Sequence, residues 1–154
     1  MAKKLIVANW KMHFTVGEAS LFLHKLQEKV QSYRDVETVL IPNMLTLQSL
    51  SLQVDRRKFR LGAQNCYYRD EGAFTGEISA TMLRALTDYV LVGHSERRHV
   101  FGEDDKTAAL TLLGIALGTN YFFHSSIHGQ GAMSHNLLFT LYAAIVYLTL
   151  QFHY

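Results

Sequence analysis

Two short groups of polar side chains stand directly after apolar runs in this sequence. Asn9 and Lys11 follow the run LIVA, and His94 and Glu96 follow the run LVG. Enzymes built from parallel β/α units place their chemistry at the carboxyl ends of strands. Amide, ammonium, imidazole and carboxylate groups are side-chain types that hold anions and transfer protons. Each pair alone is a weak signal, so we treat the four residues as a candidate site only in combination.

The elements that must position these side chains alternate along the chain. Thr15 and Glu18 form a capping-box pattern ahead of an amphipathic stretch, which predicts a helix. The predicted strands are 5–8, 36–41, 59–63 and 89–92, and we expect 5–8 to be buried. The predicted helices are 15–30, 43–53 and 79–86. In the last helix we expect Met82, Leu83 and Leu86 to face inward. Such alternation predicts parallel β/α units, either in an open doubly wound sheet or in part of a (β/α) barrel.

Composition excludes several classes of protein. A formal net charge of +2 with scattered basic residues is too mild for a nucleic-acid surface. The single cysteine, Cys66, excludes an internal disulfide and a cysteine-based zinc site, and we predict no metal site. We expect Cys66 to be buried. The apolar run before Asn9 is too short for the core of a signal peptide. We therefore expect a cytoplasmic protein of one domain.

Charge is distributed unevenly along the chain. All 15 Lys and Arg and all 13 Asp and Glu lie between Lys3 and Lys106, which leaves residues 107–154 without a formal charge. Asp104 or Asp105 is predicted to cap a helix that runs to Leu117 and stops at Gly118, with no charged outer face. Residues 121–124 are a candidate fifth strand. The apolar run 137–150 predicts a buried helix, and a membrane span over 132–154 is a less favoured alternative.

Four motifs occur in order along the first part of the chain: ANWKM at 8–12, GAQN at 62–65, GAFTGEIS at 72–79 and VGHSERRHVFGE at 92–103. Together they resemble the triosephosphate isomerase family. The resemblance covers Lys3 to about Asp105 and implies an N-terminal half of an α/β (β/α)8 TIM barrel, followed over 106–154 by an apolar tail of a different kind. Ile41-Pro42-Asn43 departs from the family's usual Pro-Pro pair, a change expected to affect packing more than chemistry.

The resemblance implies interconversion of dihydroxyacetone phosphate and glyceraldehyde 3-phosphate through an enediolate, a step of glycolysis and gluconeogenesis that requires no cofactor. Lys11 would hold the phosphate and the developing oxyanion, and Asn9 would position the oxygen. His94 would donate to the carbonyl as a neutral imidazole, a role for which this family is itself the standard example. Glu96 would orient Lys11 or assist proton transfer, and Ser95 would anchor the resting general base.

Other matched residues imply a homodimer. In the family, the loop corresponding to 66–79 projects from one subunit and docks beside the active site of its partner, with Thr75 at its tip. Arg97 would pair with Glu77 and Glu103 in that assembly. Gln64 and Asn65 would lie near the interface. The alternative is that the three charged residues are ordinary surface charges, which contribute little individually.

Residues 107–154 set limits on what this sequence is expected to do. The family's general base is a glutamate on the sixth strand, and no Asp or Glu occurs after Asp105. We therefore predict negligible isomerase activity for this polypeptide, and out-of-frame translation after Lys106 would explain the missing charge. The alternatives are a non-catalytic half-barrel that associates with intact isomerase subunits and, less favoured, a membrane-anchored module. A doubly wound nucleotide-binding protein is remote, because no G-x-G-x-x-G follows the first strand.

Overall fold

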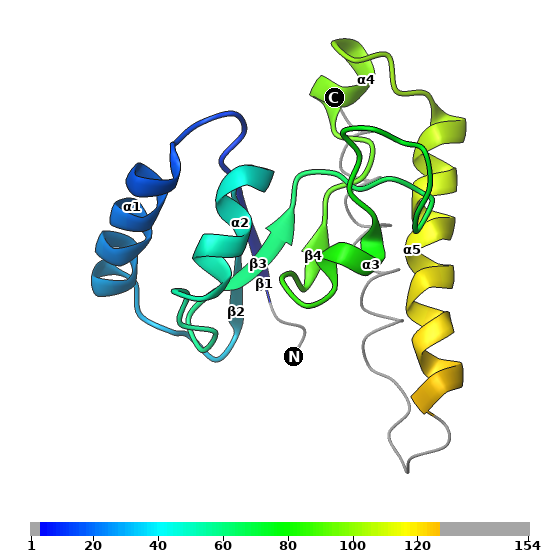
Figure 1. Cartoon of the computed structure of the whole chain (residues 1–154). Coiled ribbons are helices and arrows are strands. Elements are labelled where there is room, and N and C mark those ends of the chain that lie inside the picture. The colour runs from blue at the N-terminus through cyan, green and yellow to red at the C-terminus, as the bar shows by residue number, and fades with distance from the viewer. Residues whose placement is uncertain (1–3, 127–154) are drawn as a thin grey trace. The chain divides into compact units, whose positions relative to one another are not determined.

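The computed structural model describes residues 4–126, with side chains described through Ala116. Strands and helices alternate along the chain, as predicted (Figure 1). Two compact units are formed, one from residues up to 64 together with 83–90, and the other from 65–82 together with residues from 91 onward. The elements are β1 Lys4–Asn9, α1 Val16–Lys29, β2 Val36–Ile41, α2 Met44–Ser51, β3 Arg60–Ala63, α3 Ala80–Leu83, β4 Tyr89–Val90, α4 Ser95–His99 and α5 Asp105–Ser126.

The first unit is built on a four-stranded parallel sheet in the order β1-β2-β3-β4. β1 and β2 pair along their full lengths, from Lys4 opposite Val36 to Asn9 opposite Ile41. β2 continues to β3, and β3 pairs with β4 through Gly62 opposite Tyr89. Sequential parallel neighbours joined by helices confirm the predicted β/α units. The carboxyl ends of the strands consequently meet along one end of the sheet.

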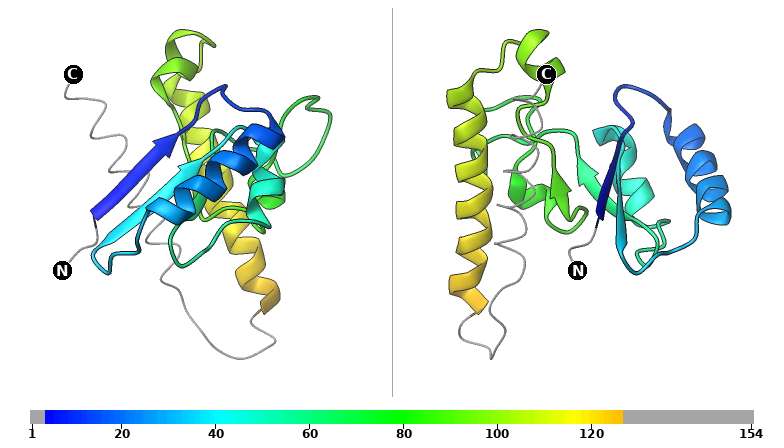
Figure 2. Two further views of the ribbon diagram at one scale, coloured as in Figure 1. Left: turned by 90° about the vertical axis from the view of Figure 1, so that its left-hand side faces the viewer. Right: turned by 180° about the vertical axis from the view of Figure 1, so that it is seen from behind.

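Helices α1 and α2 lie on the same face of this sheet (Figure 2). α1 packs against α2, and α2 packs against β3. The side chains between them are apolar and almost completely buried, as expected when a parallel sheet is covered by its crossover helices. This core contains Leu23, Val39, Leu40, Ile41, Leu47, Leu50, Phe59 and Leu61.

β1 does not have the burial that its sequence predicts. Leu5, Ile6 and Val7 remain 42%, 54% and 41% exposed. The prediction of a buried strand was therefore wrong, although the prediction of parallel pairing is confirmed. The physical reason is that, within residues 4–126, β1 pairs only with β2 and has no neighbour on its other side. An apolar run indicates burial only where both neighbours of a strand are present.

The start of α1 confirms the predicted capping box. The backbone N–H and the hydroxyl of Thr15 both donate to the carboxylate of Glu18, each at 2.8 Å. These two hydrogen bonds, the backbone bond first, hold the pKa of Glu18 below its ordinary value. A carboxylate with a lowered pKa in the folded state stabilises the fold only while it is ionised.

We expect stability to become less sensitive to acid when Glu18 is replaced by glutamine. The contribution of the Glu18 charge is fully present above the pKa of the unfolded chain, and is lost as the pH falls through the lowered pKa of the folded chain. Urea unfolding at a series of acidic pH values measures the difference between Glu18→Gln and the original chain. Glu71→Gln, at an exposed position, is the control. Identical pH profiles for the Glu18→Gln variant and the original chain would contradict the assignment.

The short α3 begins where its sequence predicts, since the hydroxyl of Ser79 accepts a hydrogen bond from the backbone N–H of Met82 at 3.2 Å. Leu83 is buried, as predicted, and Leu86 is partly buried. Met82 is exposed, so its predicted inward orientation was wrong. α3 ends at Leu83, which makes it too short to present a full helical face.

α5 begins at its predicted cap, because the carboxylate of Asp104 accepts from the backbone N–H of Thr107 at 2.7 Å. Its buried side chains, Ala108, Thr111 and Ile115, recur at helical spacing. The helix runs through Gly118 and residues 121–124 to Ser126, so the predicted stop at Gly118 and the candidate fifth strand were both wrong. One glycine costs a helix only about 1 kcal/mol relative to alanine, which does not force it to end.

No helix within residues 4–126 is long and apolar enough to cross a membrane. The predicted buried helix at 137–150 and most of the alternative membrane span lie outside the described residues.

Candidate functional site

The first candidate group lies at the carboxyl end of β1. The side-chain oxygen of Asn9 accepts a hydrogen bond from the backbone N–H of Lys11 at 2.9 Å. Lys11 has a φ of 52°, in the left-handed region that a lysine rarely adopts. Its exposed side chain therefore leaves the chain at a turn that Asn9 holds in place.

Gln64 joins this group from the end of β3. Its amide nitrogen donates to the backbone oxygen of Lys11 at 2.7 Å and approaches the side-chain oxygen of Asn9 at 3.3 Å. The backbone oxygen of Ile41, at the end of β2, lies 3.4 Å away. Three neighbouring strand ends are thus linked by one side chain. Sequence reasoning placed Gln64 near an interface and missed these contacts, although its place in the motif directly after β3 was the available signal.

Asn43 supports the same turn from the start of α2. Its amide nitrogen donates to the backbone oxygens of His13 and Phe14, at 2.8 and 2.9 Å. Its side-chain oxygen accepts from the backbone N–H of Thr46 at 3.1 Å and so caps α2. Phe14 has a φ of 70°, a second strained position in this segment. The departure from the Pro-Pro pair therefore reaches the candidate site, which the sequence alone did not indicate.

Aromatic packing fixes the remainder of the turn. The ring of Trp10, which is buried, lies 5.4 Å from Phe14 and 5.3 Å from Phe22 of α1 in edge-to-face geometry. Phe14 and Phe22 stack at 5.1 Å. Edge-to-face and stacked pairs at these separations add to the stability gained from burial. The polar group at Asn9 and Lys11 is consequently held against a rigid apolar base.

The second candidate group lies in the second unit, at the start of α4. His94 precedes α4, and its Nδ1 accepts a hydrogen bond from the backbone N–H of Glu96 at 3.2 Å. A ring nitrogen that accepts a hydrogen bond carries no proton, so the neutral ring holds its proton on Nε2. The carboxylate of Glu96 lies 3.8 Å from the same Nδ1. The His94 side chain is 16% exposed, and Ser95 is the first residue of the predicted short helical turn.

Arg98 braces the backbone that precedes His94. Its Nε donates to the backbone oxygen of Gly93 at 2.9 Å, and its guanidinium also pairs with Asp105 at the start of α5. Gly93 has a φ of 66°, and a Cβ atom there would lie 3.0 Å from the same guanidinium. Only glycine fits both demands without strain. The position of His94 is thereby tied to α4 and α5.

The loop over residues 65–79 closes on itself at its base. The backbone N–H of Tyr67 donates to the oxygen of Ile78 at 2.8 Å, and the hydroxyl of Thr81 donates to Asp70 at 2.6 Å. Thr75 and Glu77 are exposed near its tip. The base of the loop is therefore fixed while its tip is accessible.

Of the three charged residues predicted for the interface, two pair with each other within this unit. Arg97 pairs with Glu103 at 2.9 Å, whereas within one described chain it does not pair with Glu77. The Glu103 side chain is only 5% exposed, and its Oε1 has no hydrogen-bond partner. Burial, followed by the nearby charges of Glu103 and Glu77, raises the pKa of the Cys66 thiol to about 12. Cys66 is buried, as predicted, and its raised pKa makes the thiol unreactive.

A hollow of about 940 Å³ opens at the opposite end of the sheet, at the start of β2 and β3. Residues 32–38 and 56–60 line it. Three of its four arginines are already engaged, since Arg56 and Arg60 lie 2.9 and 3.7 Å from Asp88 and Arg57 pairs with Asp55 at 3.0 Å. The hollow is therefore remote from the strand ends that carry Asn9 and Lys11, and its cations are largely neutralised.

The chemistry available to the described residues is anion binding and proton transfer. Lys11 supplies a positive charge beside the Asn9 amide, and the pair His94 and Glu96 supplies an imidazole beside a carboxylate. Within the described part of the chain, no cluster of three or more His, Cys, Asp or Glu side chains could hold a metal ion. Each group is assembled inside its own unit by the hydrogen bonds given above.

Comparison with known proteins gives consistent results over the same residues. The family model described as triosephosphate isomerase matches residues 4–115. Triosephosphate isomerase from Alkaliphilus metalliredigens is 45% identical over 108 residues, which cover 70% of this chain and 43% of that protein. The Aquifex aeolicus enzyme of the same name is 43% identical over 105 residues, which cover 68% of this chain and 42% of that protein. The chain therefore spans about two fifths of the length of the curated relatives that it matches.

Proposed function

Because this chain belongs to the triosephosphate isomerase family, we propose that residues 4–115 supply the N-terminal half of a site that interconverts dihydroxyacetone phosphate and glyceraldehyde 3-phosphate. The observation that carries the proposal is the network around Lys11. Asn9 and Gln64 hold the lysine at a strained turn at the carboxyl end of β1, where β/α enzymes place their chemistry.

The proposed roles follow from charge and hydrogen-bonding capacity. Lys11 binds the substrate phosphate and stabilises the developing oxyanion, and Asn9 positions the substrate oxygen. His94 donates from Nε2 to the carbonyl, which its accepting Nδ1 supports. Glu96 assists proton transfer or orients Lys11, and Ser95 anchors the resting base. These roles require no cofactor and no metal.

A polypeptide of residues 1–154 is proposed to lack turnover by itself. The family reaction needs a carboxylate base, and residues 107–154 contain no Asp or Glu. General-base catalysis commonly contributes about 10²–10⁴-fold to the rate. The proposed catalytic role of this sequence is therefore realised only together with the other half of a barrel.

We also propose that the exposed tip of the 65–79 loop is an assembly surface, with Thr75 at its centre. Its fixed base and accessible tip support this role. The proposed interface also includes Glu77, Arg97 and Glu103, together with Gln64, which lies directly before the loop in the sequence. In a complete subunit this surface would form the family's homodimer, and in this chain it would bind an intact isomerase subunit.

The test is a chimera in which residues 4–115 replace the matching part of the Alkaliphilus metalliredigens enzyme. We expect a folded chimera that isomerises triose phosphate, and a polypeptide of residues 1–154 that does not. The unaltered relative is the positive control, and circular dichroism reports whether the chimera is folded. A folded chimera without turnover, or clear turnover by residues 1–154 alone, would contradict the proposal.

A further inference from the structure

The sheet of the first unit ends in strands that have a neighbour on one side only. Among residues 4–126, β1 pairs with β2 alone and β4 pairs with β3 alone. β1 combines this open side with three consecutive exposed apolar side chains, Leu5, Ile6 and Val7. Natural sheet edges are usually blunted by a proline, an inward charge or a bulge, and residues 5–8 contain neither proline nor charge. β1 is therefore an edge strand that could pair with a further strand.

The direction of the backbone groups identifies which atoms are available. The backbone N–H groups of Lys4 and Trp10 donate to Asp35 and Ile41, at 2.8 and 2.9 Å, and so point toward β2. Alternate residues of a strand direct their backbone groups to opposite sides. The N–H and C=O groups of Leu5 and Val7 consequently point toward the open side of β1.

The same reasoning applies to β4. The backbone N–H of Asp88 donates to Leu61 of the neighbouring strand at 2.8 Å. The next residue, Tyr89, therefore directs its N–H away from β3 and toward the open side of β4. Among residues 4–126, this sheet thus has two open parallel edges, one along β1 and one along β4, each with backbone groups directed away from its neighbouring strand.

We propose that these edges join two copies of this chain, with β1 of each copy pairing with β4 of the other. Four parallel strands from each copy give the eight strands that close a (β/α) barrel. The two contacts are identical under a twofold axis, which is the commonest symmetry of oligomers. A single closed ring leaves no open edge, and it buries Leu5, Ile6 and Val7 between strands on both sides.

This interface is distinct from the proposed loop surface and does not depend on the proposed isomerase activity. Loop contacts centre on Thr75 in the second unit, whereas the edges belong entirely to the first unit. A dimer made through the loop leaves the edge amides accessible to solvent. The two modes of dimerisation therefore differ in the solvent exchange of the edge amides, which can be measured.

The experiment combines mass measurement with backbone amide exchange on the full 154-residue chain. Sedimentation or light scattering should give twice the mass of one chain, with dissociation on dilution. In the dimer, the amides of Leu5, Val7 and Tyr89 should exchange slowly, and they should exchange rapidly once the chains have dissociated.

Val7→Pro is the decisive variant. Proline removes the N–H that faces the open edge but no hydrogen bond to β2, so it blocks pairing while sparing the sheet. We expect a monomer for Val7→Pro and a retained dimer for Val7→Thr, which keeps the N–H. Thr75→Arg, which disturbs the loop tip, should also remain dimeric. If circular dichroism shows that Val7→Pro is unfolded, Val7→Lys is used in its place. It keeps the N–H but puts a charge on the edge, which also blocks pairing.

Three results would overturn the proposal. The first is a monomer at every concentration. A monomer whose Leu5 and Val7 amides are protected counts here too, because another part of the same chain would then cover the edge. The second is a dimer that survives Val7→Pro and is lost in Thr75→Arg. The third is a dimer in which the β1 amides are protected and the Tyr89 amide is not, because that result indicates β1-to-β1 pairing.

Discussion

Replacing Lys11 by methionine in the active chimera lowers kcat/KM by about 10²–10³-fold or more, with little change in folding. Methionine keeps the length of the side chain and removes its charge. A preorganised charge or donor aimed at a developing oxyanion contributes about this factor, and Lys11 is proposed to bind the substrate phosphate as well. Because its side chain is exposed and the turn is held by backbone contacts of Asn9 and Gln64, the fold should not suffer.

Steady-state kinetics on the chimera and thermal melts of each variant measure this expectation. Lys25→Met, which removes an exposed lysine on α1, is the matched control and should leave kcat/KM unchanged. Lys11→Arg keeps the charge but changes its shape and reach, so it should recover only part of the activity. Retention of activity within a few-fold in Lys11→Met, with the melting temperature preserved, would remove Lys11 from the proposed mechanism.

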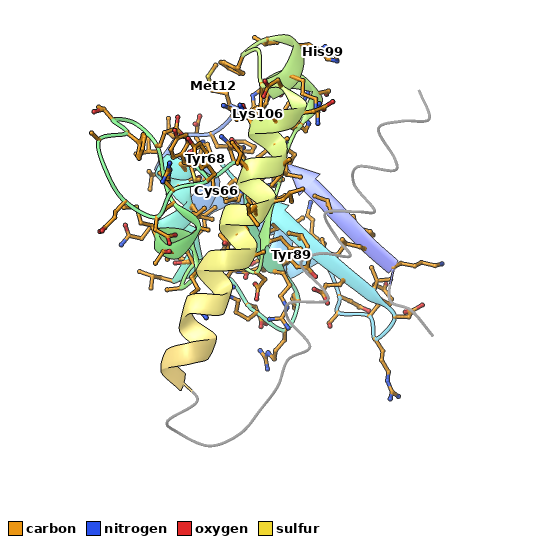
Figure 3. The ribbon with its side chains drawn as sticks, turned by 90° about the vertical axis from the view of Figure 1, so that its right-hand side faces the viewer. Met12, Cys66, Tyr68, Tyr89, His99 and Lys106 are labelled. Atoms are coloured by element: carbon orange, nitrogen blue, oxygen red, sulfur yellow. The ribbon has the colours of Figure 1, made fainter. Side chains whose placement is uncertain are left out.

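Gly114→Ala is expected to destabilise the second unit by up to roughly 2 kcal/mol. α5 passes so close to the loop segment at Tyr68 that a Cβ atom on Gly114 would lie 2.4 Å from the Tyr68 backbone oxygen. Figure 3 shows Tyr68 and Cys66 beside the first turns of this helix. Overpacking of this kind costs about 1–3 kcal/mol, and the gain of about 1 kcal/mol in helix propensity offsets only part of it.

Gly17→Ala provides the opposite result in the same chain. Gly17 lies in α1, and no atom lies within 4 Å of the position that a Cβ would take. Alanine there should stabilise the protein by up to about 1 kcal/mol through helix propensity alone. Urea unfolding monitored by circular dichroism measures both variants. Equal shifts in the same direction would show that α5 does not pack against the loop as described.

Features that depend on residues close in sequence could be predicted well. The caps at Thr15, Ser79 and Asp104 each involve a partner three residues away, and each was found where its pattern predicted it. β2 has its predicted bounds because its apolar run is buried on both sides. Local hydrogen bonds and continuous burial leave a signature that a single sequence retains.

Features that depend on distant partners could not be predicted. β1 has the sequence of a buried strand, and it is exposed because it has a neighbouring strand on one side only within residues 4–126. Gln64 reaches Asn9 across 55 positions of the chain, and nothing in the local pattern indicates that contact. α5 continues through Gly118 because one glycine is a small cost against a long run of helix hydrogen bonds. Residue types at strand ends identified the candidate side chains, whereas the contacts that hold them required the fold.

Asn43 has a consequence for how this sequence can change over time. Its amide holds two backbone oxygens of the turn after Lys11, and its oxygen caps α2. Proline at this position would have no side chain that could make any of these bonds. A change of Asn43 to proline would therefore lose three interactions at once. Such a change is disfavoured unless other residues first take over the hydrogen bonds to His13 and Phe14.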